Sequence, residues 1–229
     1  MAFSRIPTFN GGKMLHIFSF DEETNLYLPS FESEAAKEAL EKGKLFYKID
    51  GSNGLIQKGN DGLEAFQRLD TRGRPPPEVC VSLPAGSNMD SYKGHSYYYE
   101  PIQMDVNGKK ARKRNQEMLK VVQDHADHIL KFGECVSIEW VGKKFNKTPG
   151  VSHDVGIAIH AEQVCEEPVE RTFEGMKSFL LESDPPIEGL IVEYEGLYWK
   201  IVGGGFDRKC GFKTSPQSAR PPIFLYPTS

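Results

Sequence analysis

Residues 46 to 56 read FYKIDGSNGLI and place a lysine, an aspartate and two glycines beside an apolar segment. A lysine held in a partly apolar cleft, next to other cations or a metal, has a lowered amine pKa, so Lys48 would be a neutral nucleophile near neutral pH. Asp50 would hold a hydrated Mg²⁺, and Gly51 would allow the backbone to approach phosphate closely. These residue types predict attack by Lys48 on the α-phosphate of a nucleotide.

The same stretch also has an ordinary structural interpretation. A lysine at a strand start usually extends its charged end to solvent, and Asn53-Gly54 usually forms a turn. By composition, a Lys-x-Asp-Gly tetrapeptide should occur by chance in roughly one chain in twenty of this length. The stretch therefore indicates nucleotide chemistry only in combination with further residues.

FYKIDGSNGLI resembles motif I (KxDG) of the covalent nucleotidyltransferases, which comprise ATP-dependent RNA and DNA ligases and mRNA capping enzymes. The Ser-Asn after Gly51 is closer to the KxDG[ST]N or KxHGTN forms of RNA ligases than to the KxDGxR form of DNA ligases. The resemblance implies that Lys48 is the catalytic nucleophile. It places the following neighbours at the nucleotide: Tyr47, Ile49, Asp50, Gly51, Ser52 and Asn53.

Segments that resemble three further motifs follow in family order. SIEWVGKKFN resembles motif III, which makes Glu139 an acid that binds the ribose or participates through metal-bound water. PIEGLIVEY resembles motif IV and makes Glu188 a second acid directed at metal, while LYWKIV resembles motif V and makes Lys200 a cation on the α-phosphate. The implied cofactors are ATP and Mg²⁺ or Mn²⁺, with Asp50, Glu139 and Glu188 as metal ligands.

Two assignments stay open. Motif Ia should supply an arginine downstream of the nucleophile, and QRLDTRGRP offers both Arg68 and Arg72. The motif III acid is Glu139 or Glu134, because the FGE of residues 132 to 134 also resembles a motif III core; we favour Glu139.

Two positions depart from the family pattern. Val202 stands where many ligases have the second lysine of a KxK motif V. The strand after motif III often carries an aromatic residue that stacks on adenine, and GIAIHAE has no obvious counterpart. Ile157 or Ile159 would have to provide an apolar contact instead.

The chain pattern predicts an α+β protein with many turns and short strands, since it contains 15 proline and 22 glycine residues. Ser33 is a candidate N-cap for the first helix. Helices are expected over 31–42, about 115–132 and around 172–183, and a strand, turn, strand pattern over 55–69. Further strands are expected in CVSIEWVG, GIAIHAEQV and GLIVEYEGLYWKIV, and surface connections over 73–78 and 86–100.

Strand alternation adds a condition on the motif IV and V residues. Glu188 and Lys200 share a face of their hairpin only if the connection has an odd number of residues, for instance Tyr194-Glu195-Gly196. A two-residue Glu195-Gly196 turn would separate them.

The resemblance covers roughly residues 45 to 210 and is closest to the small ATP-dependent 5′-to-3′ RNA ligases typified by the chordate enzyme and its viral relatives. It implies the nucleotidyltransferase fold, with two antiparallel β-sheets and flanking helices around an ATP cleft. We expect one domain over residues 1–229: an N-terminal lead-in with a helix (1–44), the catalytic core (45–210) and a C-terminal tail (211–229). The 29 residues after Lys200 are too few for the OB domain of DNA ligases and capping enzymes.

Charge and cysteine content bound the partners. The net charge of −4 means that a polyanion would have to meet a local basic patch. Four widely spaced cysteines without a CxxC pair indicate neither a zinc site nor a disulfide framework. No apolar run or signal peptide is apparent, so we expect an intracellular monomer, cytoplasmic or nuclear, with no membrane contact. The basic clusters are Lys109, Lys110, Arg112, Lys113 and Arg114; Lys143, Lys144 and Lys147; and Arg208, Lys209 and Lys213.

The resemblance implies an ATP-dependent RNA ligase that joins RNA 3′-hydroxyl and 5′-phosphate ends through lysyl-AMP and an RNA-adenylate. Two alternatives remain. One is a noncatalytic RNA-binding module on the same fold, with tyrosines 97 to 99 as a stacking platform. The other is a GTP-dependent guanylyltransferase of the capping type. His125 and His128 are three residues apart, a spacing that metals can use, but without a second ligand pair we interpret them as helix-surface residues.

Overall fold

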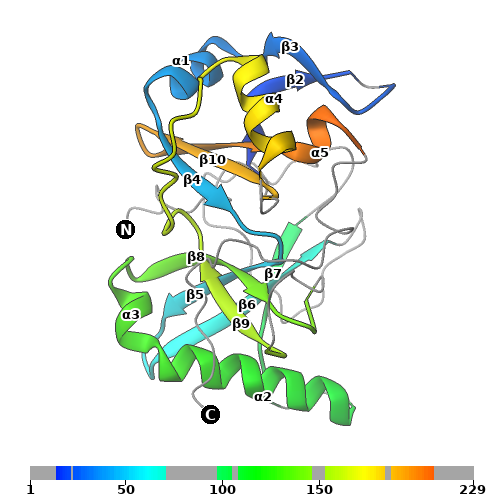
Figure 1. Ribbon diagram of the computed structural model, residues 1–229. Helices are drawn as coiled ribbons and strands as arrows, with labels where there is room; N and C mark the ends of the chain where they lie inside the picture. Colours follow the sequence, from blue (N-terminus) through cyan, green and yellow to red (C-terminus); the bar gives the residue numbers. More distant parts are fainter. Residues whose placement is uncertain are drawn as a thin grey trace. The chain divides into compact units, whose positions relative to one another are not determined.

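The computed structural model forms two compact units, each with antiparallel strand pairing and flanking helices (Figure 1). Unit 1 contains Asp50–His160, and unit 2 contains Met14–Ile49 and the described chain from Ala161 to Arg208. The predicted α+β class is therefore confirmed, while the assignment of residues 1–229 to one domain stays a prediction. Among the described residues, no helix has the length and apolar character needed to cross a bilayer. The structure describes residues 14–21, 23–70, 97–104, 108–145, 153–183 and 187–208.

Unit 2 is organised by a four-stranded sheet in the order β1-β11-β10-β4. β10 is antiparallel to both β11 and β4, and β1 runs parallel to β11 at the edge. β10 and β11 are joined by Glu195-Gly196 with φ of 50° and 78°, as a type I′ hairpin turn requires. The strands are β1 (Leu15–His16), β4 (Lys44–Lys48), β10 (Gly189–Tyr194) and β11 (Leu197–Val202).

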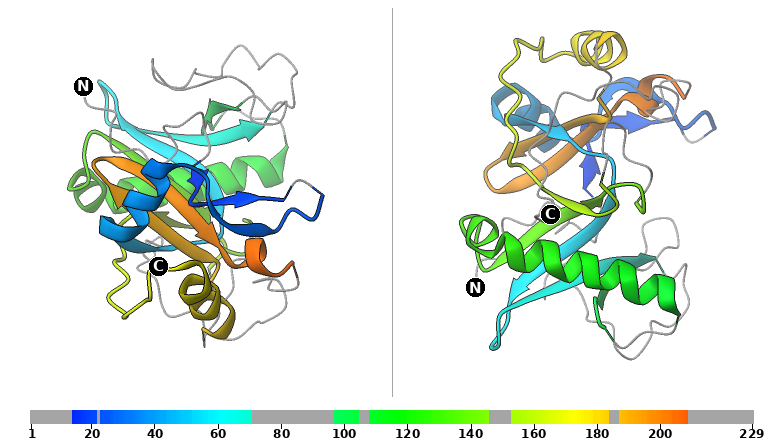
Figure 2. Two further views of the ribbon diagram at one scale, coloured as in Figure 1. Left: turned by 90° about the horizontal axis from the view of Figure 1, so that it is seen from above. Right: turned by 60° about the horizontal axis from the view of Figure 1, so that its bottom comes forward.

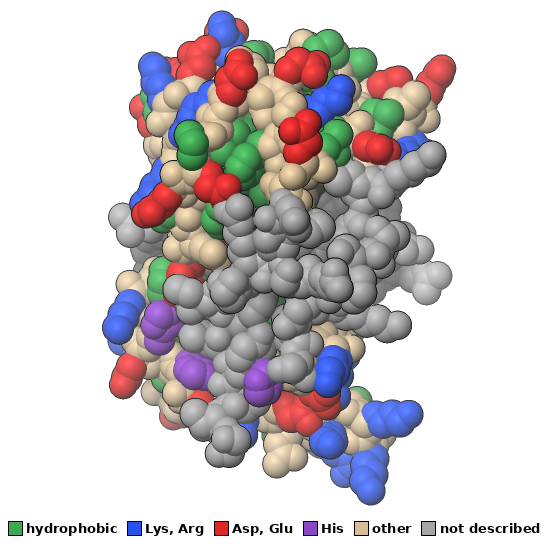
Figure 3. Space-filling model, viewed as in Figure 1, with side chains coloured by type: hydrophobic (Ala, Val, Ile, Leu, Met, Phe, Trp, Pro, Cys, Tyr) green, Lys and Arg blue, Asp and Glu red, His purple; other side chains and the backbone are tan. Residues whose placement is uncertain are grey.

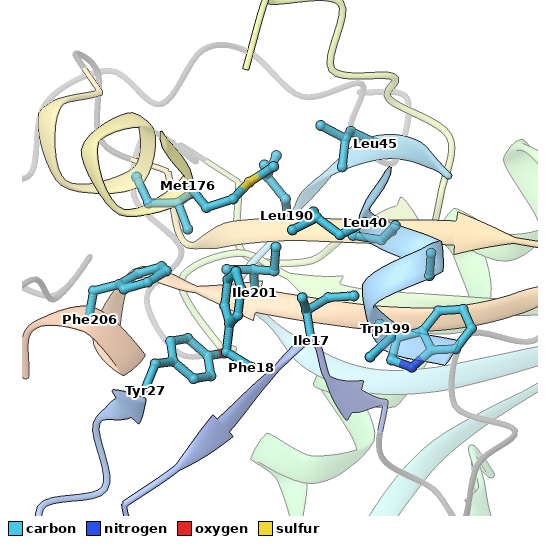
Figure 4. Close-up of a cluster of buried hydrophobic side chains, with 14 of the residues drawn as sticks. Ile17, Phe18, Tyr27, Leu40, Leu45, Met176, Leu190, Trp199, Ile201 and Phe206 are labelled. Carbon is cyan, nitrogen blue, oxygen red and sulfur yellow. The ribbon is translucent and has the colours of Figure 1, made fainter. Parts of the chain in front are cut away.

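One face of this sheet carries the main core of unit 2. Leu45, Leu190 and Ile201 on the strands meet Leu40 of α1 and Met176 of α4 in one buried cluster (Figure 4). Aromatic rings of the small β2-β3 sheet and of α5 complete this cluster. The elements are α1 (Glu34–Lys42), α4 (Phe173–Glu182), α5 (Gly203–Phe206), β2 (Phe18–Phe20) and β3 (Tyr27–Phe31).

Helix α1 leads directly into the strand that carries Lys48. Its predicted cap is confirmed, because the Ser33 hydroxyl accepts a hydrogen bond from the Ala36 amide at 3.1 Å. Gly43 follows the helix at a φ of −70°, so positive φ does not explain the glycine. A Cβ at this position would lie 2.5 Å from the Ala39 carbonyl oxygen and 2.8 Å from that of Glu193. Glycine is needed here because the backbone passes so close to its neighbours.

Unit 1 is organised by a five-stranded antiparallel sheet in the order β7-β6-β5-β8-β9. Helix α2 runs along one face of this sheet (Figure 2, right), and Met118, Val121 and Val122 of the helix are fully buried against Ile138 and Ile157. The elements are β5 (Ser52–Lys58), β6 (Leu63–Asp70), β7 (Tyr97–Pro101), β8 (Cys135–Val141), β9 (Gly156–Ile159), α2 (Lys109–Asp124) and α3 (Ala126–Leu130).

Most predicted elements occur, with two corrections in unit 1. The helix expected from about residue 115 begins at Lys109 and is interrupted at His125, where φ is −118° and ψ is 20°. The segment Tyr97–Pro101, expected within a surface connection, is a strand paired with β6. Tyr98 and Tyr99 point to opposite faces of the sheet, and a sequence pattern of three consecutive aromatics hides that alternation. Residues 73–78 and 86–96 lie outside the described part of the chain.

We predict that Arg171 stabilises the junction between α1 and β4. Its guanidinium donates hydrogen bonds to the carbonyl oxygens of Leu40 at 2.8 Å and Gly43 at 2.7 Å. Arg171→Met keeps the aliphatic stem and removes both bonds, so the free energy of unfolding should fall by about 1–3 kcal/mol, measured by urea denaturation. Lys177→Met, which breaks an exposed ion pair of 3.7 Å, is the control and should change stability by less than about 1 kcal/mol. Equal effects of the two substitutions would contradict the role given to Arg171.

Candidate active site

Lys48 is the last residue of β4, and its side chain forms a close ion pair. The Lys48 Nζ donates to both carboxylate oxygens of Glu188, at 2.7 and 2.6 Å. The two side chains are only 13% and 22% exposed, so solvent screens the pair weakly. Glu188 directly precedes β10, and β10 begins at Gly189, which pairs with Lys48 in the ladder. The pair is therefore fixed by the register of two neighbouring strands.

The ion pair bears on the chemistry of the lysine. In this pair Lys48 is an ammonium, and an ammonium has no lone pair with which to attack phosphorus. The sequence predicts a neutral amine beside cations or a metal, whereas the structure places a carboxylate against Lys48. To become a nucleophile, Lys48 must leave Glu188 and lose a proton.

Lys200, the motif V candidate, lies on the same face of the unit 2 sheet as Lys48. Lys200 pairs with Ile191, and Ile191 also pairs with Phe46, which is two residues from Lys48 on β4. Directly opposite residues and residues two apart share a face, so Lys48 and Lys200 do as well. Phe46 and Ile191 are 6% and 0% exposed, which makes the surroundings of both cations partly apolar.

The hairpin condition derived from the sequence gives a correction. The connection is the two-residue Glu195-Gly196 turn, which by strict alternation would place position 188 on the opposite face from Lys200. Glu188, however, lies one residue outside β10, where the ladder no longer dictates side-chain direction. Its carboxylate nevertheless contacts the Lys48 Nζ. The odd-length turn is therefore wrong. The motif IV acid Glu188 still lies next to a lysine, because its carboxylate contacts Lys48.

In unit 1, several predicted residues form one row across the sheet, on the face away from α2. Asn53 pairs with Glu139, and Glu139 pairs with Ala158. Arg68 pairs with Tyr99. Because Gly54 pairs with Gln67, the next position in the same ladder places Arg68 beside Asn53. We call these five positions the polar row: Tyr99, Arg68, Asn53, Glu139 and Ala158.

Asn53, the last polar residue of motif I, is held by two hydrogen bonds. The Tyr99 hydroxyl donates to its Oδ1 at 2.9 Å, and its Nδ2 donates to the Ile138 carbonyl oxygen at 3.5 Å. Asn53 is 6% exposed and Tyr99 1%. Tyr99 is therefore a buried partner of motif I, so its assignment to an exposed stacking platform is wrong. Asn53 lies within β5, so the predicted Asn53-Gly54 turn is also absent.

The structure separates the two candidate acids of motif III. Glu139 lies in the polar row and is 8% exposed. Glu134 precedes β8, has a side chain that is 65% exposed, and pairs at 3.3 Å with Lys58 at the far end of β5. Only Glu139 is thus close to Asn53 of motif I. Arg68 lies in the same row, while Arg72 is outside the described residues.

The sequence interpretation missed His160, which contacts Glu139. The His160 Nε2 lies 3.1 Å from the Glu139 Oε1, and its Nδ1 lies 2.9 Å from the Ser137 Oγ. Ile157 and Ile159, expected at the nucleotide, are 0% and 5% exposed in the core beneath α2. Their side chains point away from the polar row, because β9 alternates. His160 follows Ile159, so alternation places it on the side of the polar row. That alternation was the signal that could have identified His160.

The remaining motif I residues have local roles. A Cβ on Gly51 would lie 2.6 Å from the Trp140 carbonyl oxygen and 3.0 Å from the Glu139 Cβ, so this glycine allows close packing of motif I on β8. Ser52 begins β5, and the Tyr47 hydroxyl donates to the Glu167 carboxylate. The chain passes from unit 2 into unit 1 between Ile49 and Asp50, that is, inside motif I.

The acids suit Mg²⁺ in their chemistry. Asp50 and Glu139 belong to unit 1 and Glu188 to unit 2, and carboxylate oxygens are the ligands that Mg²⁺ prefers. Glu188 already binds a cationic group, which shows that its surroundings suit positive charge. In the described ranges, no group of three or more His, Cys, Asp or Glu side chains is arranged to hold a metal by itself.

Cys135 does not compete with Lys48 as a nucleophile. It is half-buried at the start of β8, and burial raises the pKa of its thiol to about 11. A thiol with this pKa is protonated at neutral pH, and the thiolate is the reactive form.

Comparison of the sequence with protein-family models and with curated proteins finds no match.

Proposed function

We propose that this protein is an ATP-dependent RNA ligase with the nucleotidyltransferase fold, and that Lys48 carries the AMP. The observation that carries the proposal is the ion pair of Lys48 with Glu188 on the face that also holds Lys200. Lys48 and Lys200 share a face of the unit 2 sheet, and Glu188, from a third part of the chain, contacts Lys48. If the Lys-x-Asp-Gly tetrapeptide occurred by chance, this arrangement of the motif residues would not be expected.

In the first step Lys48 leaves Glu188, loses its proton and attacks the α-phosphorus of ATP. A nitrogen–phosphorus bond forms, the bond to the bridging oxygen breaks, and pyrophosphate leaves with the electron pair. Lys200 would stabilise negative charge on the α-phosphate oxygens. Mg²⁺, when bound, would neutralise phosphate charge, and in unit 2 Glu188 is the carboxylate that could hold it.

The later steps transfer the AMP to RNA. A 5′-phosphate oxygen of RNA attacks lysyl-AMP, which releases Lys48 and forms an RNA-adenylate. The 3′-hydroxyl of a second end then attacks the 5′-phosphorus, forms the phosphodiester and expels AMP. Both steps exchange one phosphorus bond for another and need no further oxidant or reductant.

In unit 1, the polar row contains the predicted residues that could contact a nucleotide. Asn53 is only five residues from Lys48 along the chain, and its register next to Glu139 links motifs I and III. We assign the ribose or metal contact to Glu139 and a phosphate contact to Arg68. The Ser52-Asn53 form of motif I favours RNA over DNA as the nucleic acid.

Two alternatives are less well supported. A noncatalytic RNA-binding module would use tyrosines 97 to 99 for stacking, but Tyr99 is buried. It would also give no reason for an ion pair between lysine and glutamate at the motif positions. A GTP-dependent capping-type enzyme would use the same lysine, so the nucleotide itself must distinguish it.

We predict covalent labelling of Lys48 by α-labelled ATP and Mg²⁺. Label should remain on the denatured wild-type protein and be absent from Lys48→Arg. An arginine keeps the positive charge opposite Glu188 but stays protonated, so the ion pair survives while the nucleophile is lost. Lys44→Arg on the same strand is the control and should retain the label.

Four outcomes of this labelling experiment matter. Equal labelling of Lys48→Arg and the wild type would exclude Lys48 as the nucleophile. No label on the wild type with either ATP or GTP would exclude the enzyme, and labelling by GTP alone would favour the capping alternative. Labelled protein that then seals nicked RNA completes the proposed function.

We predict that the first two turns of α2 bind RNA phosphates. The segment lacks a side-chain N-cap and any acid in the first turn, although the helix dipole disfavours cations there. Four exposed cations project from it, Lys109, Lys110, Arg112 and Lys113, at the lower right of Figure 3. Within the described part of the chain, Lys113 pairs with Glu117 at a loose 3.9 Å. We call these four side chains the α2 patch.

Changing all four residues of the α2 patch to glutamine should weaken RNA binding by about tenfold or more at physiological salt, measured by fluorescence anisotropy. The slope of log affinity against log salt should fall by roughly 0.7–0.9 per lost phosphate contact. Lysyl-AMP formation should not change, because ATP carries too few phosphates to need this patch. The control replaces four lysines outside the α2 patch, each of which has an ion-pair partner: Lys37, Lys42, Lys120 and Lys177. Equal losses in both variants would contradict a specific role for the α2 patch.

A further inference from the structure

A buried polar network surrounds the Glu139 carboxylate in unit 1. Ser137, Glu139 and His160 are 3%, 8% and 8% exposed. The chain of contacts runs from the Ser137 Oγ to the His160 Nδ1 at 2.9 Å, and from the His160 Nε2 to the Glu139 Oε1 at 3.1 Å. Burying such groups in a sheet core costs free energy unless each one is hydrogen-bonded. The network supplies hydrogen bonds to the Ser137 Oγ, to both ring nitrogens of His160 and to the Glu139 Oε1.

The strand register holds the imidazole in a single orientation. His160 lies opposite Ser137, because its backbone amide donates to the Ser137 carbonyl oxygen at 3.1 Å. Glu139 is two residues further along the same strand and shares the face of Ser137. The ring is thus fixed by its own backbone at one end and by the serine hydroxyl at Nδ1. Its Nε2 has to point toward the carboxylate.

The types of hydrogen bond decide which nitrogen carries the hydrogen. A carboxylate only accepts, so the His160 Nε2 is the donor in the contact with Glu139. In the neutral ring Nδ1 is then an acceptor and receives the Ser137 hydroxyl hydrogen. Each hydrogen bond has one donor and one acceptor, so the network has a definite direction from Ser137 to Glu139.

We propose that His160 is a positioning residue that fixes the Glu139 carboxylate in the orientation needed at the nucleotide, with Ser137 fixing His160. The inference rests on the proposed function, because it gives Glu139 its role there. A glutamate side chain has three rotatable bonds, and a contact at Oε1 removes much of that freedom before ATP binds. A group that is already oriented loses less entropy when it binds ligand or stabilises charge.

A purely structural role for His160 predicts different behaviour. Histidine and serine in a sheet core could simply fill space, and their loss would then lower stability whatever residue stands at position 139. A positioning role requires that the effect on the nucleotide reaction disappears when Glu139 itself is changed. A double-mutant cycle between His160 and Glu139 measures this difference.

The experiment uses the full chain and four variants. His160→Leu removes the donor at similar volume, and His160→Gln keeps an amide donor near the position of Nε2. Glu139→Gln and the double variant His160→Leu/Glu139→Gln complete the cycle. Lysyl-AMP formation is measured as rate constant and as KM for ATP with Mg²⁺. ATP binding is measured by calorimetry in the same four variants, each of which also carries Lys48→Arg. Proteins with Lys48→Arg cannot form lysyl-AMP.

We expect His160→Leu to slow lysyl-AMP formation by about 10- to 100-fold, the range typical of residues that orient a ligating side chain. His160→Gln should restore most of the rate. With Glu139→Gln already present, His160→Leu should slow the reaction by less than about threefold. ATP binding in the Lys48→Arg proteins should show the same lack of additivity, which loss of packing alone would not produce.

Each outcome decides a separate point. An unlabelled wild-type protein would overturn the proposed function itself. A labelled wild type with additive effects of His160→Leu and Glu139→Gln would overturn the positioning role alone, as would failure of His160→Gln to restore the rate. If His160→Leu does not fold, Ser137→Ala replaces it in the cycle. It removes only the Oγ hydrogen bond, and a slower reaction that depends on Glu139 is again the expected result.

Discussion

The ion pair between Lys48 and Glu188 is the interaction on which the candidate chemistry depends. In this pair the lysine is an ammonium and the glutamate is a carboxylate, and both side chains are largely buried. Removing one partner would leave the other charge partly buried and uncompensated, which costs far more than an exposed pair gains. Any reaction at Lys48 must therefore give Glu188 another cationic partner at the moment the lysine leaves. Nucleotide with its divalent cation can do so, which would couple activation of the lysine to arrival of the substrate.

The path of the chain explains why motif I contains such different residues. Its first part ends a strand of unit 2 and delivers Lys48, and its second part begins a strand of unit 1 and delivers Asn53. Gly51 permits the second part to lie against the Trp140 carbonyl oxygen, where any side chain would collide. The short polar stretch between two apolar strands is thus required by folding as well as by chemistry. Each unit keeps its own part of motif I in register through its own ladder.

Sequence patterns predicted the strands and helices well where burial and alternation act within one element. The cap at Ser33, the β5-β6 hairpin and the helix after Thr172 follow from local residue preferences. What the sequence could not settle depends on pairing between distant strands. Tyr99 reads as one of three similar tyrosines, yet only the register with Arg68 places it beside Asn53. Glu188 could not be placed from hairpin parity, because it lies just outside the ladder.

The two acids are held by physically different partners, and this difference suits two different tasks. Glu188 faces an ammonium on a flexible lysine stem, so its partner can be exchanged for another cation without moving a strand. Glu139 faces the imidazole of His160, whose Nδ1 contacts the Ser137 hydroxyl and whose backbone amide donates to the Ser137 carbonyl oxygen. This partner cannot be exchanged without disturbing β8 or β9. A mobile partner suits an acid whose neighbour must change during a reaction. A rigid partner suits an acid that must present the same oxygen atoms before and after.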